Sequence, residues 1–93
     1  MRIDLALKYL CILKSRSSAK HLCSDNAILV NDLPVKPSTS VRTGDKITIH
    51  FPNRILSIRL LEVPDKQLSK STSPTYYQQI ASIDTRDVED TPE

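Results

Sequence analysis

The spacing of hydrophobic positions changes early in the chain, from a helical repeat to the alternation typical of strands. Two short apolar runs with three- and four-residue spacing predict helices over residues 5–11 and 16–24. Asp4 stands where its side chain can cap the first helix, and Ser15 stands where it can cap the second. Asn26 is expected to end the second helix, because Asn accepts a left-handed backbone.

Four apolar runs with strand character follow, and turn residues separate them. Their sequences are AILVN, LPVKP, KITIHF and ILSIRLL. In the third run Ile47, Ile49 and Phe51 share one face. The two prolines of the second run cannot both donate to a ladder, which predicts an edge or irregular strand. The expected order of elements is therefore two helices and then four strands.

Composition and charge both shift at Val63. Residues 1–62 hold ten Lys or Arg and five acids, a net charge of +5, whereas residues 63–93 hold three and six, a net charge of −3. We therefore divide the chain into a basic domain, residues 1–62, and a polar acidic tail, residues 63–93. A basic body favours a polyanionic partner.

The tail contains one candidate element. Pro is favoured at the first helical position, so Ser73-Pro74 predicts a short helix over about residues 74–82. Its apolar side chains, expected to dock on the domain, are Tyr76, Tyr77 and Ile80. The last ten residues are predicted to be disordered.

Size and composition exclude several kinds of site. A chain of 93 residues with one Gly cannot form a glycine-rich phosphate loop and buries too little surface for a deep catalytic cleft. The four residues most suited to bind zinc lack any zinc-finger spacing: Cys11, Cys23, His21 and His50. We therefore expect no metal and no cofactor, and we interpret both thiols as small buried hydrophobic groups.

The first apolar run could be mistaken for a signal peptide. Asp4 and Lys8 interrupt it, no small-residue cleavage site follows, and no run approaches the length of a membrane span. A cytoplasmic protein with reduced thiols is expected.

The strongest chemical signal is the segment LKSRSSAKHL, residues 13–22, which carries a cluster of cations on the second predicted helix. Arg16 and Lys20 are four residues apart and point the same way, and no acid lies at helical spacing from either. A solvated helix face is the simpler interpretation. Further cations on both helices and after the first turn favour a phosphate-binding surface instead. The candidate residues are Arg2, Lys8, Lys14, Arg16, Lys20 and Lys36.

The scarcity of aromatic residues narrows the kind of polyanion. Only Tyr9 and Phe51 occur in the basic part, which argues against a groove that stacks single-stranded bases. Recognition of structured RNA by shape and backbone fits better. DNA fits less well, because neither helix offers Asn or Gln to read base edges.

The motifs MRID, KSRSSAKHL and VND…VKPS…VRTGDKITI resemble the S4 RNA-binding domain, a family named after a small-subunit ribosomal protein. The resemblance covers about residues 1–62. It implies an α+β fold in which a two-helix hairpin packs on a small, mostly antiparallel sheet of four strands. Among stand-alone members, the chain is similar to the ribosome-associated heat-shock protein and RqcP families. Those proteins bind the large ribosomal subunit and contact ribosomal RNA and tRNA.

The resemblance also implies roles for single residues. Arg2, Lys14, Arg16, Lys20 and Lys36 match positions that face RNA in the family. Asp4 matches too, and we interpret it as a helix cap. Cys11 stands where the family often has Arg, which removes one cationic contact. Asn26 and Asp32 replace glycines and are expected to accept the backbone shape required there.

Three functions remain open from the sequence. The first is a monomeric, non-catalytic factor that binds ribosomal RNA or tRNA at the large subunit in translation rescue or quality control. The second is a detached RNA-targeting module of an RNA-modifying enzyme, since S4 domains also accompany pseudouridine synthases and tRNA synthetases. The third is a protein-interaction module of the β-grasp type, although the chain ends in DTPE and not in the Gly-Gly of sulfur carriers. No catalytic constellation is visible, so we expect no enzyme.

Overall fold

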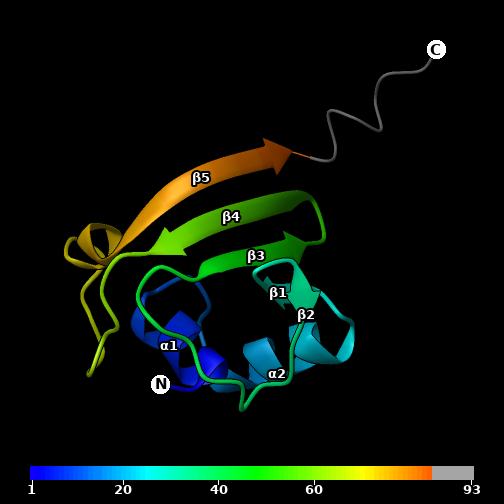
Figure 1. Cartoon of the computed structure of the whole chain (residues 1–93), viewed down its shortest axis with the longest axis horizontal. Helices are drawn as coiled ribbons and strands as arrows, with labels where there is room; N and C mark the ends of the chain where they lie inside the picture. The colour runs from blue at the N-terminus through cyan, green and yellow to red at the C-terminus, as the bar shows by residue number, and fades with distance from the viewer. Residues whose placement is uncertain (85–93) are drawn as a thin grey trace.

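The computed structural model describes residues 1–84 and shows two helices packed on one face of a five-stranded antiparallel sheet (Figure 1). The elements are α1 (Ile3–Tyr9), α2 (Arg16–Ser24), β1 (Ile28–Val30), β2 (Leu33–Pro34), β3 (Lys46–Phe51), β4 (Arg54–Leu60), the 3-10 helix η1 (Ser73–Tyr76) and β5 (Tyr77–Asp84). The strand order is β2-β1-β3-β4-β5. The predicted α+β architecture is confirmed, with five strands in place of four.

The two helices begin for different reasons. The Ser15 hydroxyl accepts a hydrogen bond from the Ser18 N–H at 3.2 Å, so the predicted cap of α2 is confirmed. The predicted cap of α1 is wrong, because α1 begins at Ile3 and Asp4 lies inside its first turn. The Ile3 and Asp4 N–H groups instead donate to the carbonyls of Thr39 and Pro37, at 2.7 and 3.2 Å. A loop from elsewhere in the chain thus replaces the side-chain cap.

The expected left-handed backbone occurs at Asn26 and Asp32, and Asn31 and Cys11, the latter with φ 61° after α1, adopt it without having been expected to. Asn26 has φ 55° after α2, and Asn31 and Asp32, between β1 and β2, have φ 53° and 71°. Positive φ at both central residues is the geometry of the commonest two-residue hairpins. The Asn31 side chain also accepts from the Lys46 N–H at 3.0 Å, so it shapes this turn.

The core lies between the helices and the inner face of the sheet. Ile47 and Ile49 are fully buried there, and Phe51 is half-buried on the same face, as the alternation predicted. Cys23 is buried as expected, whereas Cys11 is only half-buried, and its thiol donates to a backbone carbonyl. Other fully buried members are Ile3, Ala6, Leu7, Leu10, Ala19, Ile28, Ile58 and Leu60.

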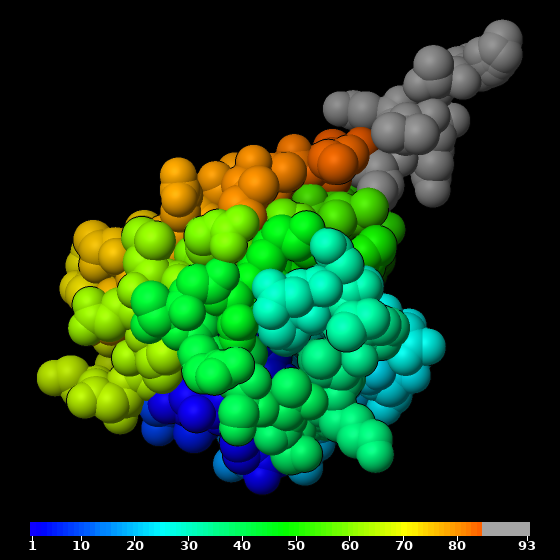
Figure 2. Space-filling view, viewed as in Figure 1, coloured from blue at the N-terminus to red at the C-terminus, as the bar shows by residue number. Residues whose placement is uncertain are grey.

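The segment after residue 72 departs from the predicted helix over residues 74–82. Pro74 does begin a helical turn, but η1 ends at Tyr76, and β5 then pairs with β4 along its whole length. The exposed edge of β4 offers a full ladder of backbone hydrogen bonds, which outweighs a weak local helix preference. Figure 2 shows β5, in orange, along the outer edge of the molecule. The expected docking of Ile80 is wrong, because its side chain, on β5, is 46% exposed.

The sequence analysis also predicted that Tyr76 and Tyr77 dock on the domain and that the last ten residues are disordered. Tyr76 and Tyr77 are half-buried against the core, as expected. The prediction of disorder concerns residues 84–93, which lie outside the described residues except for Asp84.

Candidate nucleic-acid interface

Two arginines and a buried aspartate form a hydrogen-bonded group of charges where the two helices begin. The Arg2 guanidinium donates through Nε to Asp4 Oδ1 at 3.1 Å and through Nη2 to Oδ2 at 3.0 Å. Arg16 Nη2 donates to the same Oδ2 at 3.5 Å. Asp4 is fully buried, whereas the two arginine side chains are 45% and 44% exposed. We call Arg2, Asp4 and Arg16 the arginine cluster.

The fold brings the cluster together because the beginnings of both helices meet. Arg2 directly precedes α1, and Arg16 is the first residue of α2. Each guanidinium carries five N–H donors, of which Arg2 uses two and Arg16 one on Asp4. The remaining donors lie on exposed side chains that Asp4 holds at two points for Arg2 and at one for Arg16, and guanidinium groups suit paired contacts with phosphate oxygens.

Asp4 remains ionised in spite of its burial. Burial alone raises the pKa of the Asp4 carboxyl, but the Arg2 hydrogen bonds, a bond from the Leu5 N–H and the charges of Arg2 and Arg16 outweigh it. The net effect lowers the pKa of Asp4 below its ordinary value. Burial, together with the Asp4 charge, raises the pKa of the nearby Cys23 thiol. The cluster therefore carries two positive charges and one negative charge at neutral pH.

As expected, no acid lies at helical spacing from Arg16, but Arg16 does have an acidic partner. That expectation holds along α2 itself, but Asp4 reaches Arg16 from the other helix. Lys20 lies one turn further along α2, is exposed, and has no ion pair within residues 1–84. Arg2 and Arg16 thus form one group, and Lys20 flanks it on the same helix.

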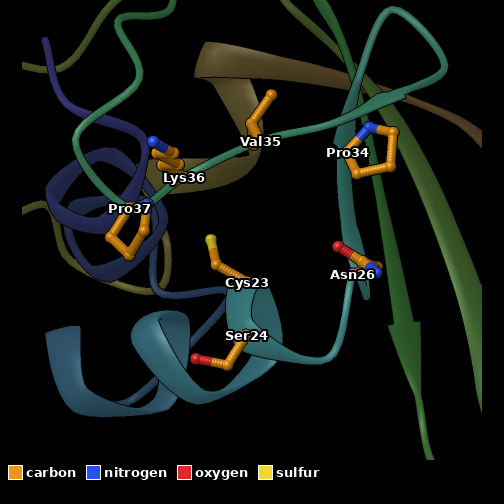
Figure 3. Close-up of a pocket in the computed structure, with 7 residues that line it drawn as sticks. All are labelled: Cys23, Ser24, Asn26, Pro34, Val35, Lys36 and Pro37. Atoms are coloured by element: carbon orange, nitrogen blue, oxygen red, sulfur yellow. The ribbon is translucent and has the colours of Figure 1, made fainter.

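The other three candidate residues lie on other segments of the chain. Lys8 and Lys14 line a hollow beside the last turn of α1. Lys36 lies on the segment that follows β2, across a second hollow from Cys23 and Ser24 at the end of α2 (Figure 3). Lys8 and Lys14 thus share one hollow, whereas Lys36 directly precedes Pro37, whose carbonyl accepts from the Asp4 N–H at 3.2 Å.

The sequence analysis missed two residues. It interpreted Asp4 as a cap, although Asp4 positions the two arginines. It assigned Lys70 to the acidic tail, whereas Lys70 lines the same hollow as Lys8 and Lys14. The sequence could have indicated Lys70, because Lys66 and Lys70 lie in the first part of the tail, whereas most of the tail's acids lie beyond residue 84.

Residues 1–84 contain no group of three or more His, Cys, Asp or Glu side chains placed to hold a metal ion. No helix among these residues has the length and hydropathy of a membrane span.

Comparison with known proteins identifies the family. The S4 domain family model matches residues 1–47. The RQC P-site tRNA stabilizing factor of Streptococcus pneumoniae is 33% identical over 76 residues, which cover 82% of this chain and 86% of that protein. The factor of the same name from Helicobacter pylori J99 is 36% identical over 64 residues, 69% of this chain and 76% of that protein.

A solved structure shares the fold. The trimeric structure of Vibrio cholerae Heat Shock Protein 15 has a TM-score of 0.79 and 24% identity, and the match covers 87% of this chain and 82% of that one. The resemblance predicted from the sequence motifs is confirmed. The matched family model, the relatives and the helix hairpin packed on an antiparallel sheet together establish that this chain belongs to the S4 domain family.

Proposed function

We propose that this protein is a non-catalytic RNA-binding factor that acts at the large ribosomal subunit in ribosome quality control, where it contacts tRNA and ribosomal RNA. Membership of the S4 domain family supports RNA binding, and the names of the relatives support the tRNA and the pathway. A ribosomal target implies a cytoplasmic location. One copy of the chain is enough for this role.

The arginine cluster is the observation that carries the proposal. The Asp4 carboxylate is fully buried, so an approaching phosphate meets the exposed guanidinium groups of Arg2 and Arg16 and not the acid. Arg2 and Arg16 would hold phosphate oxygens through their free N–H donors. Lys20 and Lys36 would contact further phosphates as mobile point charges. Recognition of this kind reads the shape and backbone of folded RNA.

A binding assay with a matched pair of variants tests the proposal. Arg16→Gln removes a charge from the cluster, whereas Arg59→Gln removes the same charge from the sheet face opposite the helices. RNA binding would be measured on large ribosomal subunits loaded with tRNA over a range of salt concentrations. We expect Arg16→Gln to weaken binding and to lower the salt slope by about 0.7–0.9 for the lost phosphate contact, and Arg59→Gln to leave the slope unchanged.

Other outcomes would favour the two alternative functions. Turnover of any RNA by pure protein would support the module of an RNA-modifying enzyme. Absence of binding to ribosomal particles, together with a stable protein partner, would support the β-grasp interaction module. Equal effects of Arg16→Gln and Arg59→Gln would remove the cluster from the binding surface. Sedimentation velocity of the free protein checks the expected monomer.

A further inference from the structure

A hollow of about 400 Å³ lies between the last turn of α1, the connection from α1 to α2, and the segment of residues 61–72, here called the linker. Three lysines line it, and none of the residues around it is an acid. We call Lys8, Lys14 and Lys70 the lysine hollow; its other lining residues are Cys11, Ile12, Leu13 and Gln67.

The linker is fixed against α1 by specific contacts, and these hold Lys70 at the hollow. Leu68 is buried in the core, its N–H donates to the Tyr9 carbonyl at 3.2 Å, and its carbonyl accepts from the Cys11 thiol at 3.2 Å. The Gln67 side-chain amide donates to the carbonyls of Lys8 and Tyr9 at 3.2 and 3.4 Å. The carbonyls of Lys8 and Tyr9 at the end of α1 therefore accept hydrogen bonds from the linker.

The charge in the hollow is not neutralised within residues 1–84. The acids of the salt bridges there are Asp4 and Asp32, and neither pairs with Lys8, Lys14 or Lys70. Three like charges around one concave surface raise the positive potential in it and favour a counter-ion. The apolar walls formed by Ile12 and Leu13 strengthen that field.

We propose that the lysine hollow binds a backbone phosphate of RNA, and that the linker is therefore part of the RNA-binding surface. The identity of the anion rests on the proposed function, whereas the site itself is separate from the arginine cluster. A phosphate fits because each ammonium group has three donors and no fixed geometry, and the hollow offers no planar fork for paired recognition of a carboxylate. Lys70 lies outside the segment, residues 1–47, that matches the family model.

The test compares two lysines of the same linker. Lys70 lines the hollow, whereas Lys66 is exposed and does not line it. We expect Lys70→Gln to weaken RNA binding about two- to fivefold, the range of a single solvent-exposed ion pair, and to lower the salt slope by about 0.7–0.9. Lys66→Gln is expected to leave the slope unchanged. Because both lysines are exposed, neither change threatens folding, and the melting temperature checks this.

A second variant asks whether the lysines contact one phosphate. If Lys14 and Lys70 share it, the double change Lys14→Gln with Lys70→Gln loses less affinity than the two single losses combined. Fully additive losses would mean separate contacts and would overturn a shared site.

Two controls separate the possible sources of the anion. Inorganic phosphate is titrated into the protein while backbone amide signals of residues 66–71 are followed by NMR. If phosphate shifts these signals but Lys70→Gln leaves RNA affinity unchanged, the hollow takes free phosphate and the proposal is overturned. Binding of an acidic peptide that RNA does not displace would likewise overturn it. Failure of the proposed function looks different, since wild-type protein then binds no ribosomal RNA at all.

Discussion

Arg2 and Asp4 face each other through two parallel hydrogen bonds, at 3.1 and 3.0 Å, although only the carboxylate is buried. This arrangement gives Asp4 a different purpose from that of an ordinary helix cap. The acid anchors one guanidinium by a two-point contact and draws Arg16 of α2 to the same oxygen. Asp4 is therefore a positioning residue for the two cations.

The first prediction concerns the removal of that acid. Asp4→Asn raises the net charge by one unit, yet we expect RNA affinity to fall, because Arg2 and Arg16 lose their shared partner. Stability is expected to decrease by about 1–3 kcal/mol, the range for hydrogen bonds to a charged group. Urea unfolding and RNA titration measure the two effects.

Asp65→Asn is the matched control for this prediction. It adds the same unit of charge at an exposed position in the linker. It should leave stability unchanged and leave RNA affinity equal or slightly higher. If both variants bind RNA more tightly, net charge and not geometry governs binding.

The second prediction concerns the stability of the protein at low pH. The folded protein holds the pKa of Asp4 below its ordinary value of 3.8. The ionised form therefore contributes stability that is fully present above about pH 3.8 and is lost as the pH falls from there through the folded-state pKa. In thermal unfolding between pH 7 and pH 2, the stability of wild-type protein should fall more steeply with decreasing pH than that of Asp4→Asn. Parallel curves for the two proteins would contradict the assignment.

The third prediction concerns the start of α2. Ser15→Ala removes the acceptor of the Ser18 N–H and should cost about 1 kcal/mol. Ser17→Ala changes the same residue type two positions on, where the side chain is exposed. Ala is a better helix former than Ser, so this control should be neutral or slightly stabilising. If urea unfolding shows that Ser15→Ala and Ser17→Ala lower the free energy of unfolding equally, the helix cap is not the source of the effect of Ser15→Ala.

The fourth prediction concerns the backbone after α2. Asn26 has φ 55°, a conformation that costs most side chains about 1–2 kcal/mol. Asn26→Ala should therefore destabilise the protein by about 1 kcal/mol, whereas Asn26→Gly should not. Denaturant midpoints of the two variants give the comparison. A loss of similar size for Gly would point to the Asn26 side chain and not to its backbone.

The fifth prediction concerns the linker. Leu68 is 7% exposed and Leu61 is 48% exposed. Leu68→Ala should cost about 2–5 kcal/mol and expose the linker to proteases, because the side chain fills part of the core. Leu61→Ala should cost little. Retention of protease resistance in Leu68→Ala would show that the hydrogen bonds to Tyr9 and Cys11 hold the linker without it.

Features that depend on neighbours in the chain were predictable from the sequence. The spacing around Ser15 predicted both the cap and the helix, and Asn26 was expected to take the left-handed backbone that it adopts. Alternation along residues 46–51 predicted which side chains of β3 face the core. Each of these depends on the preferences of a residue and those within four positions of it.

Features that depend on contacts between distant segments were not predictable. Nothing near Asp4 indicates that residues 37–39 satisfy the first N–H groups of α1, which leaves the carboxylate free to bind two arginines. The strand β5 forms because β4 offers a free edge, a fact absent from the local pattern of residues 77–84. Likewise, Cys11 was expected to leave the surface with one cation fewer, because it replaces an Arg of the family. The linker, however, places Lys70 at the hollow that Cys11 also lines.

The buried carboxylate also bears on the kinetics of recognition. An arginine side chain has about 2 kcal/mol of rotamer entropy to lose when it becomes ordered. Because Arg2 is ordered by Asp4 when the chain folds, that loss belongs to folding and not to the encounter with a ligand. A partner therefore meets an Arg2 guanidinium that is already oriented, and its contacts with this group add to the lifetime of the complex with a smaller ordering cost.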